Sequence, residues 1–265
     1  MKKKPLIIGI AGGVGPYAGL DLNRKIFDET RACTDQDHLP VILSSMPGMI
    51  GDRTRFLLGK EKVNPAYALA SVLHALENAG ASVVAIPCNT AHSPRIFSVI
   101  QKQLRKHRSQ LRLLNMIEET GRFIRKNYPG LDRVGVLATL GTYASRVYLE
   151  ILEPMGISVI IPDLRTQKRV QAAIYDKTYG IKALANPVTS RARRDLLAAV
   201  ASLKAQDAEA VILGCTEIPL ALTDRSVGSL PLVDPTRVLA RALIIAAAGP
   251  GRMKKTEDYR HLSSD

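Results

Sequence analysis

The feature that most constrains the fold is an internal repeat that divides the chain into two similarly organised halves. Segments 8–18 and 134–144 align, and each begins with an apolar run followed by a glycine-bearing turn. Segments 81–88 and 208–215 align at a spacing that differs by one residue, and both end in a cysteine. A duplicated unit of this kind predicts two similar lobes related by pseudo-symmetry.

Within the first half, short apolar runs alternate with segments of helical periodicity. Residues 6–10, 41–44 and 83–86 are typical of buried strands, whereas residues 18–27 and 65–79 have the spacing of helices. This alternation predicts an α/β fold. We expect mostly parallel sheets, because strands that are covered on both faces are nearly continuous apolar runs.

The repeat and the last helix set the expected lobe boundaries. We assign residues 1–116 and 222–250 to the first lobe and residues 117–221 to the second. Asp234 is a good N-cap, and the proline after it suits the first position of a C-terminal helix that completes the first lobe. The polar segment 251–265 is predicted to be a disordered tail.

Composition limits the classes of partner. The formal net charge is +13, but aromatic residues make up only 5% and Trp is absent, so stacking platforms for nucleic acids are poorly supplied. We therefore interpret the charge as a solvated basic surface that favours anionic substrates, with no nucleic-acid partner. No apolar run is long enough to span a membrane. Three cysteines build no disulfide framework, so a reducing cytoplasm is expected. No spacing of Cys or His residues predicts a metal site.

Two of the cysteines occupy equivalent places in the repeat. Cys88 lies in the motif 87–92 and Cys215 in the motif 214–217, each after an apolar strand. Backbone N–H groups are free where a strand ends and a helix begins, and they attract an anion and stabilise a thiolate. Ligands of open α/β sheets bind beyond the carboxyl ends of strands. We therefore expect the two thiols to face each other across one cleft.

Two thiols on opposite sides of a bound carboxylate suit racemisation. One group removes the α-proton, and the other returns a proton to the opposite face. Cysteine suits both tasks, since its ordinary pKa of about 8.5 is close to the working pH. Donors aimed at the carboxylate would stabilise the enediolate in a closed, dry cleft. Cys33 lies outside such a motif and is interpreted as a buried small hydrophobic residue.

With these motifs the chain resembles the aspartate racemase branch of the aspartate/glutamate racemase family. The resemblance runs from Leu6 to Ala247, in the segments 8–16, 52–54, 87–92, 116–120, 137–139, 141–142, 174–175, 180–183, 214–217 and 233–235. It implies two Rossmann-like lobes with the active site in the cleft between them, usually in a homodimer. It also implies that the enzyme uses no pyridoxal phosphate, metal or nucleotide.

The resemblance also assigns roles to residues. It implies Cys88 and Cys215 as the two acid/base residues. The α-carboxylate would bind the loop after the first cysteine, and a cationic pair would hold a distal carboxylate. The implied substrate-binding residues are Arg53, Asn89, Thr90, Ala91, Lys182 and Thr216. Residues expected to support the site without reacting are Gly13, Val14, His92, Thr139 and Glu217.

The sequence departs from the family pattern in three places. Val14 stands where methionine is usual, and the extra residues 176–179 precede Lys182, which leaves open that Lys182 is a surface lysine. The second motif reads Cys-Thr-Glu at 215–217 instead of the Cys-Thr-His of glutamate racemases. This difference argues against a dedicated role in supplying D-glutamate for cell walls.

The predicted function is cofactor-independent racemisation of aspartate, glutamate or both. A broad-specificity amino-acid racemase, a hydantoin racemase and a maleate isomerase remain alternatives on the same scaffold. Related decarboxylases keep one cysteine, so two complete motifs count against them. A silent protein that binds anions or nucleic acid is disfavoured for the same reason.

Overall fold

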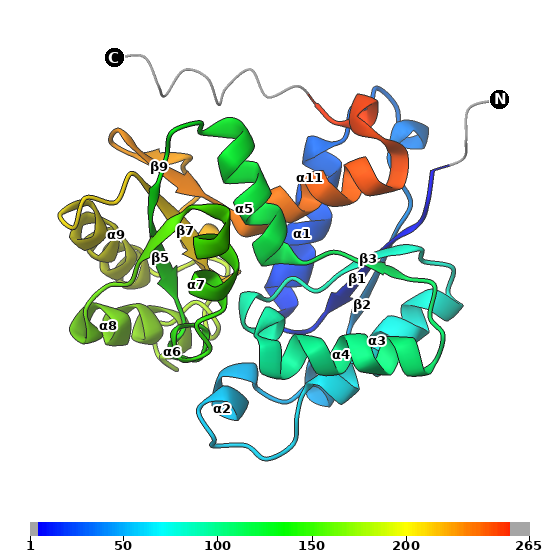
Figure 1. Cartoon of the computed structure of the whole chain (residues 1–265), viewed down its shortest axis with the longest axis horizontal. Helices are drawn as coiled ribbons and strands as arrows, with labels where there is room; N and C mark the ends of the chain where they lie inside the picture. The colour runs from blue at the N-terminus through cyan, green and yellow to red at the C-terminus, as the bar shows by residue number, and fades with distance from the viewer. Residues whose placement is uncertain (1–4, 255–265) are drawn as a thin grey trace.

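The structure is a computed structural model that describes residues 5–254. Two lobes lie side by side, each built around its own open sheet (Figure 1). Neighbouring strands run parallel except for one antiparallel pair at the edge of the second sheet. The expected α/β fold of two lobes with mostly parallel sheets is therefore confirmed.

The two sheets share a strand order. The first sheet runs β2-β1-β3-β4 and the second β6-β5-β7-β9-β8, so the order β2-β1-β3 matches β6-β5-β7, as the repeat predicts. The strands are β1 (Ile8–Gly12), β2 (Val41–Ser45), β3 (Val83–Ala85), β4 (Arg112–Leu113), β5 (Arg133–Ala138), β6 (Ser158–Ile160), β7 (Ala210–Gly214), β8 (Ser226–Val227) and β9 (Leu230–Val233).

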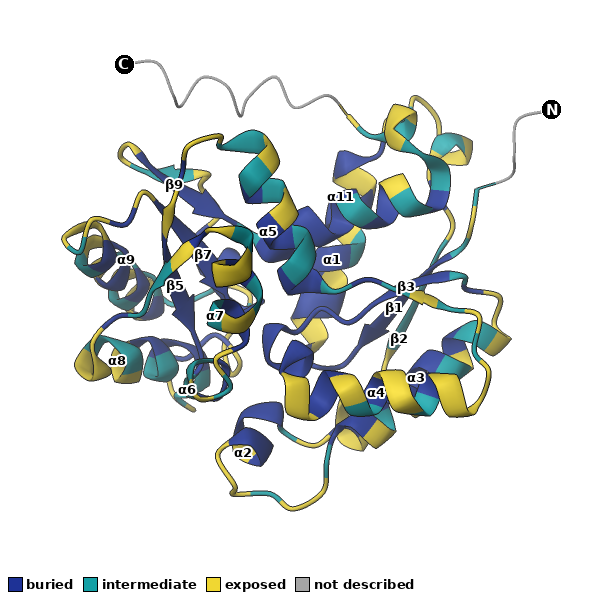
Figure 2. Cartoon of the chain, in the orientation of Figure 1, coloured by how far each residue is buried: buried dark blue, intermediate teal, exposed yellow. Residues whose placement is uncertain are grey.

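Helices cover both faces of each sheet. They are α1 (Pro16–Glu29), α2 (Arg53–Leu57), α3 (Ala66–Asn78), α4 (Pro94–Lys106), α5 (Met116–Asn127), α6 (Leu140–Ala144), α7 (Val147–Leu152), α8 (Leu164–Tyr175), α9 (Ser190–Lys204), α10 (Ile218–Ala221) and α11 (Pro235–Ala248). In the first lobe α1 and α11 pack on one face and α3 and α4 on the other. In the second lobe α8 and α9 lie opposite α5 and α7. Figure 2 shows buried faces toward the sheets and exposed faces outward, as amphipathic helices require.

Two boundaries differ from the expectation. The sequence assigns 222–250 to the first lobe, but β8 and β9 extend the second sheet, and α11 packs on the first. The apolar strand β9 pairs with β7 before the chain crosses back. Part of the predicted disordered tail is ordered, since Arg31 N donates to Arg252 O at 2.7 Å and Lys254 N to Glu29 O at 2.9 Å. Residues 255–265 lie outside the described residues.

Buried ion pairs join α1 to α11, beside the place where the chain crosses between the lobes. Lys25 is 2% exposed and pairs with Asp21 and, at 2.6 Å, with Asp234. Asp234 also caps α11 by accepting from two backbone N–H groups, as predicted.

No helix within residues 5–254 has the length and apolar character needed to cross a membrane.

Candidate active site

The two strand ends that carry the cysteine motifs open on one cavity, to which each lobe contributes a cysteine. Cys88 follows β3 and Cys215 follows β7, the equivalent strand of the second sheet. The cavity is lined by Val14, Arg53, Thr54, Cys88, Asn89, Thr90, Thr139, Tyr175, Lys182, Cys215, Thr216 and Glu217. Its free volume is about 10 Å³, the room of one water molecule. An amino acid therefore enters only when the lobes or the lining side chains shift.

The loop after Cys88 is held from the other lobe. Its short 3₁₀ turn, Asn89–His92, is buried throughout. The Asn89 amide oxygen accepts a hydrogen bond of 2.6 Å from the hydroxyl of Tyr148 on α7. This bond fixes the amide, whose nitrogen has no partner among residues 5–254, and Asn89 lines the cavity. The amide N–H groups of Asn89 are thus left available as donors.

Threonine hydroxyls join the two lobes at the cavity. Thr54 on α2 donates to Thr139 at 3.2 Å, and Thr90 lies 3.0 Å from the hydroxyl of Thr142. Thr139 and Thr142 are 3.1 Å apart at the start of α6. A side chain at Gly141 would meet the Thr54 Cα at 2.7 Å, so α2 and α6 approach closely only because Gly141 has none.

Arg53 lies at the first position of α2, which Asp52 caps. Its guanidinium is buried and donates to the carbonyl oxygens of Val14 at 2.9 Å and Gly51 at 3.1 Å. Burial lowers the pKa of Arg53, but the neighbouring Cys88 raises it, and the net shift is upward. Arg53 is therefore a fixed cation beside the first thiol.

Glu217 stands beside the second thiol. The Cys215 thiol donates to one Glu217 oxygen at 2.9 Å, and Lys182 donates to the other. Burial, followed by the Glu217 charge, raises the pKa of Cys215 well above its usual value. Burial also acts to raise the pKa of Glu217, but Lys182 and the thiol bond lower it overall. Lys182 further lies 5.3 Å above the ring centre of Tyr175.

Most of the predicted site residues meet in this cavity. Those that do are Cys88, Cys215, Arg53, Asn89, Thr90, Lys182, Thr216, Val14, Thr139 and Glu217. Ala91 is fully buried and, like Gly13 and His92, is not among the lining residues. Gly13 packs on the Met46 backbone, and His92 binds the Cys88 carbonyl at 2.9 Å through Nδ1. Burial lowers the pKa of His92 to about 4, so its ring is neutral near pH 7.

Three residues of the site were missed by sequence reasoning. Thr54 and Tyr175 line the cavity and lie in segments 52–54 and 174–175, whose resemblance to the family was a usable signal. Tyr148, which holds Asn89, lies in no motif. Within residues 5–254, no group of three or more His, Cys, Asp or Glu side chains is arranged to hold a metal ion.

Two matched α/β lobes each bring a cysteine to a shared cavity. The model of the Asp/Glu/Hydantoin racemase family matches residues 11–243, and the chain belongs to this family. It is therefore a racemase, as its motifs predicted.

The chain is also similar in sequence or fold to individual racemases. The chain is 27% identical over 243 residues to the broad specificity amino-acid racemase RacX of Bacillus subtilis, with 90% of this chain and 96% of the relative covered. Picrophilus torridus aspartate racemase is 28% identical, with a TM-score of 0.79 over 98% of this chain and 100% of that one. The glutamate racemase isoform RacE1 of Bacillus anthracis, 14% identical, shares the fold, with a TM-score of 0.61 over 93% and 83% of the chains.

Proposed function

We propose that the protein racemises an amino acid without a cofactor, with Cys88 and Cys215 as the two acid/base residues. The observation that carries this proposal is that the thiols come from equivalent strand ends of opposite lobes and line the same cavity. A ligand between them would present one face of its α-carbon to each sulfur. Removal and return of the proton on opposite faces inverts the carbon.

The donors around the thiols suit the α-carboxylate. Asn89, Thr90 and Thr216 bind it in this proposal, with Asn89 oriented by Tyr148. When the Cα–H bond breaks, its electron pair spreads into the carboxylate as an enediolate. Donors fixed in advance stabilise that charge more strongly than water does, because the cleft excludes solvent.

Aspartate and glutamate are the proposed substrates. Arg53 and Lys182 both line the cavity, and two cations suit a second carboxylate. A broad set of amino acids is the second candidate. The Lys182 ammonium already binds Glu217, which leaves less positive charge for a substrate side chain. The named relatives include one of each kind, an aspartate racemase and a broad specificity amino-acid racemase.

A screen of L-amino acids in deuterated water, with no added cofactor, tests this function. We expect exchange of the α-proton together with formation of the D-enantiomer, fastest for aspartate or glutamate. Faster reaction of neutral amino acids would favour the broad set. Absence of exchange with every amino acid, for a protein shown to be folded, would refute the proposal.

We also propose a homodimer in the reducing cytoplasm. Tyr17, Leu20 and Phe27 are exposed on α1 beside the exposed Arg24, and a second copy could cover these apolar side chains. Two thiols that carry the chemistry must stay reduced, which the cytoplasm ensures. Light scattering of the purified protein tests the oligomeric state, and Leu20→Glu should dissociate a dimer built on this face. A monomer at working concentration would contradict this part of the proposal.

A further inference from the structure

The two thiols of the cavity stand beside opposite charges. Cys215 donates to the Glu217 carboxylate, whereas Cys88 lies beside the Arg53 guanidinium. Their access to solvent is nearly equal, since Cys88 is 6% and Cys215 7% exposed. The two thiols therefore differ mainly in the charge that faces them.

Glu217 is held in its ionised form. Lys182 donates to one of its oxygens, and the Thr216 hydroxyl lies 3.4 Å from the other, which also accepts from the Cys215 thiol. Glu217 is 4% exposed, so water screens its charge little. A thiolate at Cys215 would place a second negative charge against this carboxylate, whereas a thiol donates a hydrogen bond to it.

The other titratable groups around the sulfurs leave this contrast in place. Burial raises the pKa of the three tyrosines that interact electrostatically with Cys215, so they stay neutral near pH 7: Tyr143, Tyr148 and Tyr175. His92, at the Cys88 carbonyl, is neutral as well. The charged groups near the thiols, within residues 5–254, are then Arg53 with Asp52 on one side and Glu217 with Lys182 on the other.

We propose that Glu217 keeps Cys215 protonated in the free enzyme, so that Cys215 is the thiol acid and Cys88, beside the Arg53 guanidinium, is the residue that takes up the α-proton. This assignment rests on the proposed racemisation and specifies its starting state. The Cα–H bond breaks, its proton joins the Cys88 sulfur, and its electron pair remains on the enediolate. The Cys215 S–H bond then breaks, and that proton forms the new Cα–H bond on the opposite face.

Glu217 acts through Cys215 and is a positioning residue. A carboxylate beside a thiol could instead serve as a base that removes the thiol proton. The two roles predict opposite effects of Glu217→Gln. If Glu217 holds the proton on the sulfur, its replacement leaves Lys182 as the nearby charge, and the thiolate of Cys215 becomes more abundant. If Glu217 is the base, the thiolate becomes scarcer.

Alkylation of the free enzyme by iodoacetamide, followed for each cysteine by mass spectrometry between pH 6 and 10, distinguishes these roles. The thiolate is the reacting form, and the exposed Cys33 serves as the internal reference. In the unmodified protein we expect Cys88 to be labelled before Cys215. In Glu217→Gln we expect labelling of Cys215 to accelerate roughly tenfold and its pH profile to move to lower pH, because the thiolate is more abundant once the carboxylate charge is gone.

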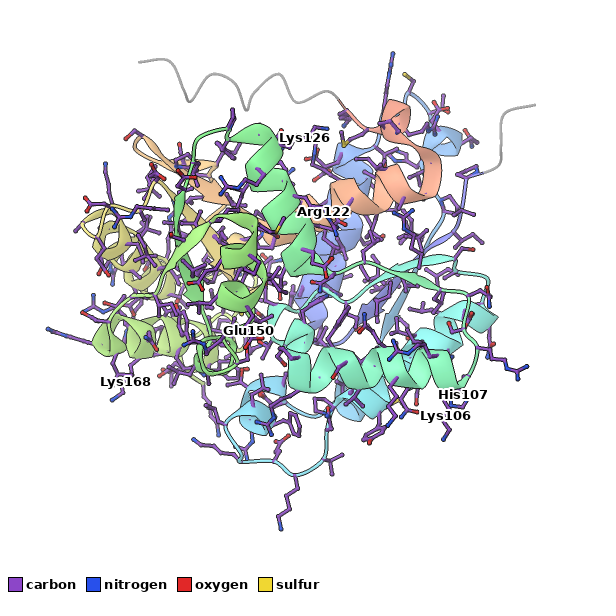
Figure 3. The ribbon with its side chains drawn as sticks, in the orientation of Figure 1. Lys106, His107, Arg122, Lys126, Glu150 and Lys168 are labelled. Atoms are coloured by element: carbon purple, nitrogen blue, oxygen red, sulfur yellow. The ribbon has the colours of Figure 1, made fainter. Side chains whose placement is uncertain are left out.

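Glu150→Gln is the matched control, because Glu150 is exposed on α7 (Figure 3), and it should leave both rates unchanged. Labelling of Cys215 as fast as that of Cys88 in the unmodified protein, or slower labelling of Cys215 in Glu217→Gln, would overturn the assignment. The readout needs no turnover. A protein with this labelling pattern and no racemase activity would refute the proposed function alone, and an active racemase without the pattern would refute the assignment alone.

Discussion

The hydrogen bond from Tyr148 to Asn89 gives the sharpest test of how one lobe prepares the other. Tyr148→Phe removes the hydroxyl that donates to the Asn89 amide oxygen at 2.6 Å. Both side chains are buried, so the oxygen loses its partner in a place that water hardly reaches. An unpaired buried acceptor costs about 1–3 kcal/mol of unfolding free energy. Burial raises the pKa of Tyr148 well above its usual value, so the hydroxyl donates at any working pH.

The same substitution should also reduce activity, because a freed amide no longer points at the substrate carboxylate. Loss of one well-placed donor in an active site costs about a hundredfold or more, and a misdirected donor costs less. We therefore expect kcat/KM to fall about 10- to 100-fold, equivalent to about 1.4–2.7 kcal/mol. Urea unfolding and steady-state racemisation measure the two effects separately.

Tyr143→Phe is the matched control. The Tyr143 hydroxyl donates to the Val136 carbonyl at 2.9 Å and accepts from the Ala138 amide at 2.8 Å, entirely within the second lobe. We expect it to lower stability by a similar amount while kcat/KM stays within about twofold of the unmodified value. Equal losses of activity in both variants, or full activity in Tyr148→Phe, would refute the reasoning.

Three further predictions follow from charges in the structure. Arg53→Ala should lower kcat/KM for aspartate at least about tenfold more than for alanine, because only aspartate has a second carboxylate; equal losses would remove Arg53 from the distal site. Lys25→Met should cost about 3–5 kcal/mol in urea unfolding, since it removes the buried cation shared by Asp21 and Asp234 and leaves Asp21 only the exposed Arg24. Lys106→Met, exposed on α4 (Figure 3), should be neutral. Burial lowers the pKa of His92 to about 4 in the folded protein. As the pH falls, the unfolded chain therefore binds a proton at this ring before the folded protein does. Stability should therefore fall by about 3 kcal/mol as the pH drops from 6.5 to 4, and His92→Gln, unlike the exposed His107→Gln, should lack this loss.

Much of the fold could be predicted because the chain follows local rules. Apolar runs of strand length formed β1, β2 and β3, and Asp234 capped the last helix as its side chain suggested. The sequence assigns all of residues 222–250 to the first lobe, whereas the chain returns to that lobe only after β9. An apolar run such as Leu230–Val233 fits either sheet by composition, and pairing with β7 is decided by tertiary contacts that one sequence does not reveal.

The residues that line the cavity could be predicted where a motif carries chemistry, but not where a residue acts by its position alone. Cys88 and Cys215 stand at strand ends, so their meeting follows from topology. Tyr148 is the second residue of α7, and nothing in its neighbours along the chain indicates that it reaches the other lobe. Lys182 was foreseen in the cavity, but its bond to Glu217 was not, because two residues 35 positions apart become partners only through the fold.

The most direct test of two-thiol racemisation is the isotope content of both enantiomers early in the reaction. An L-amino acid that proves active is converted to a few per cent in deuterated water, and chiral separation with mass spectrometry measures deuterium in each enantiomer. We expect one deuterium in every D-product molecule and none in the unreacted L-substrate, because separate groups take and return the proton. Product that keeps its original hydrogen would contradict the two-thiol mechanism and point to one group acting on both faces.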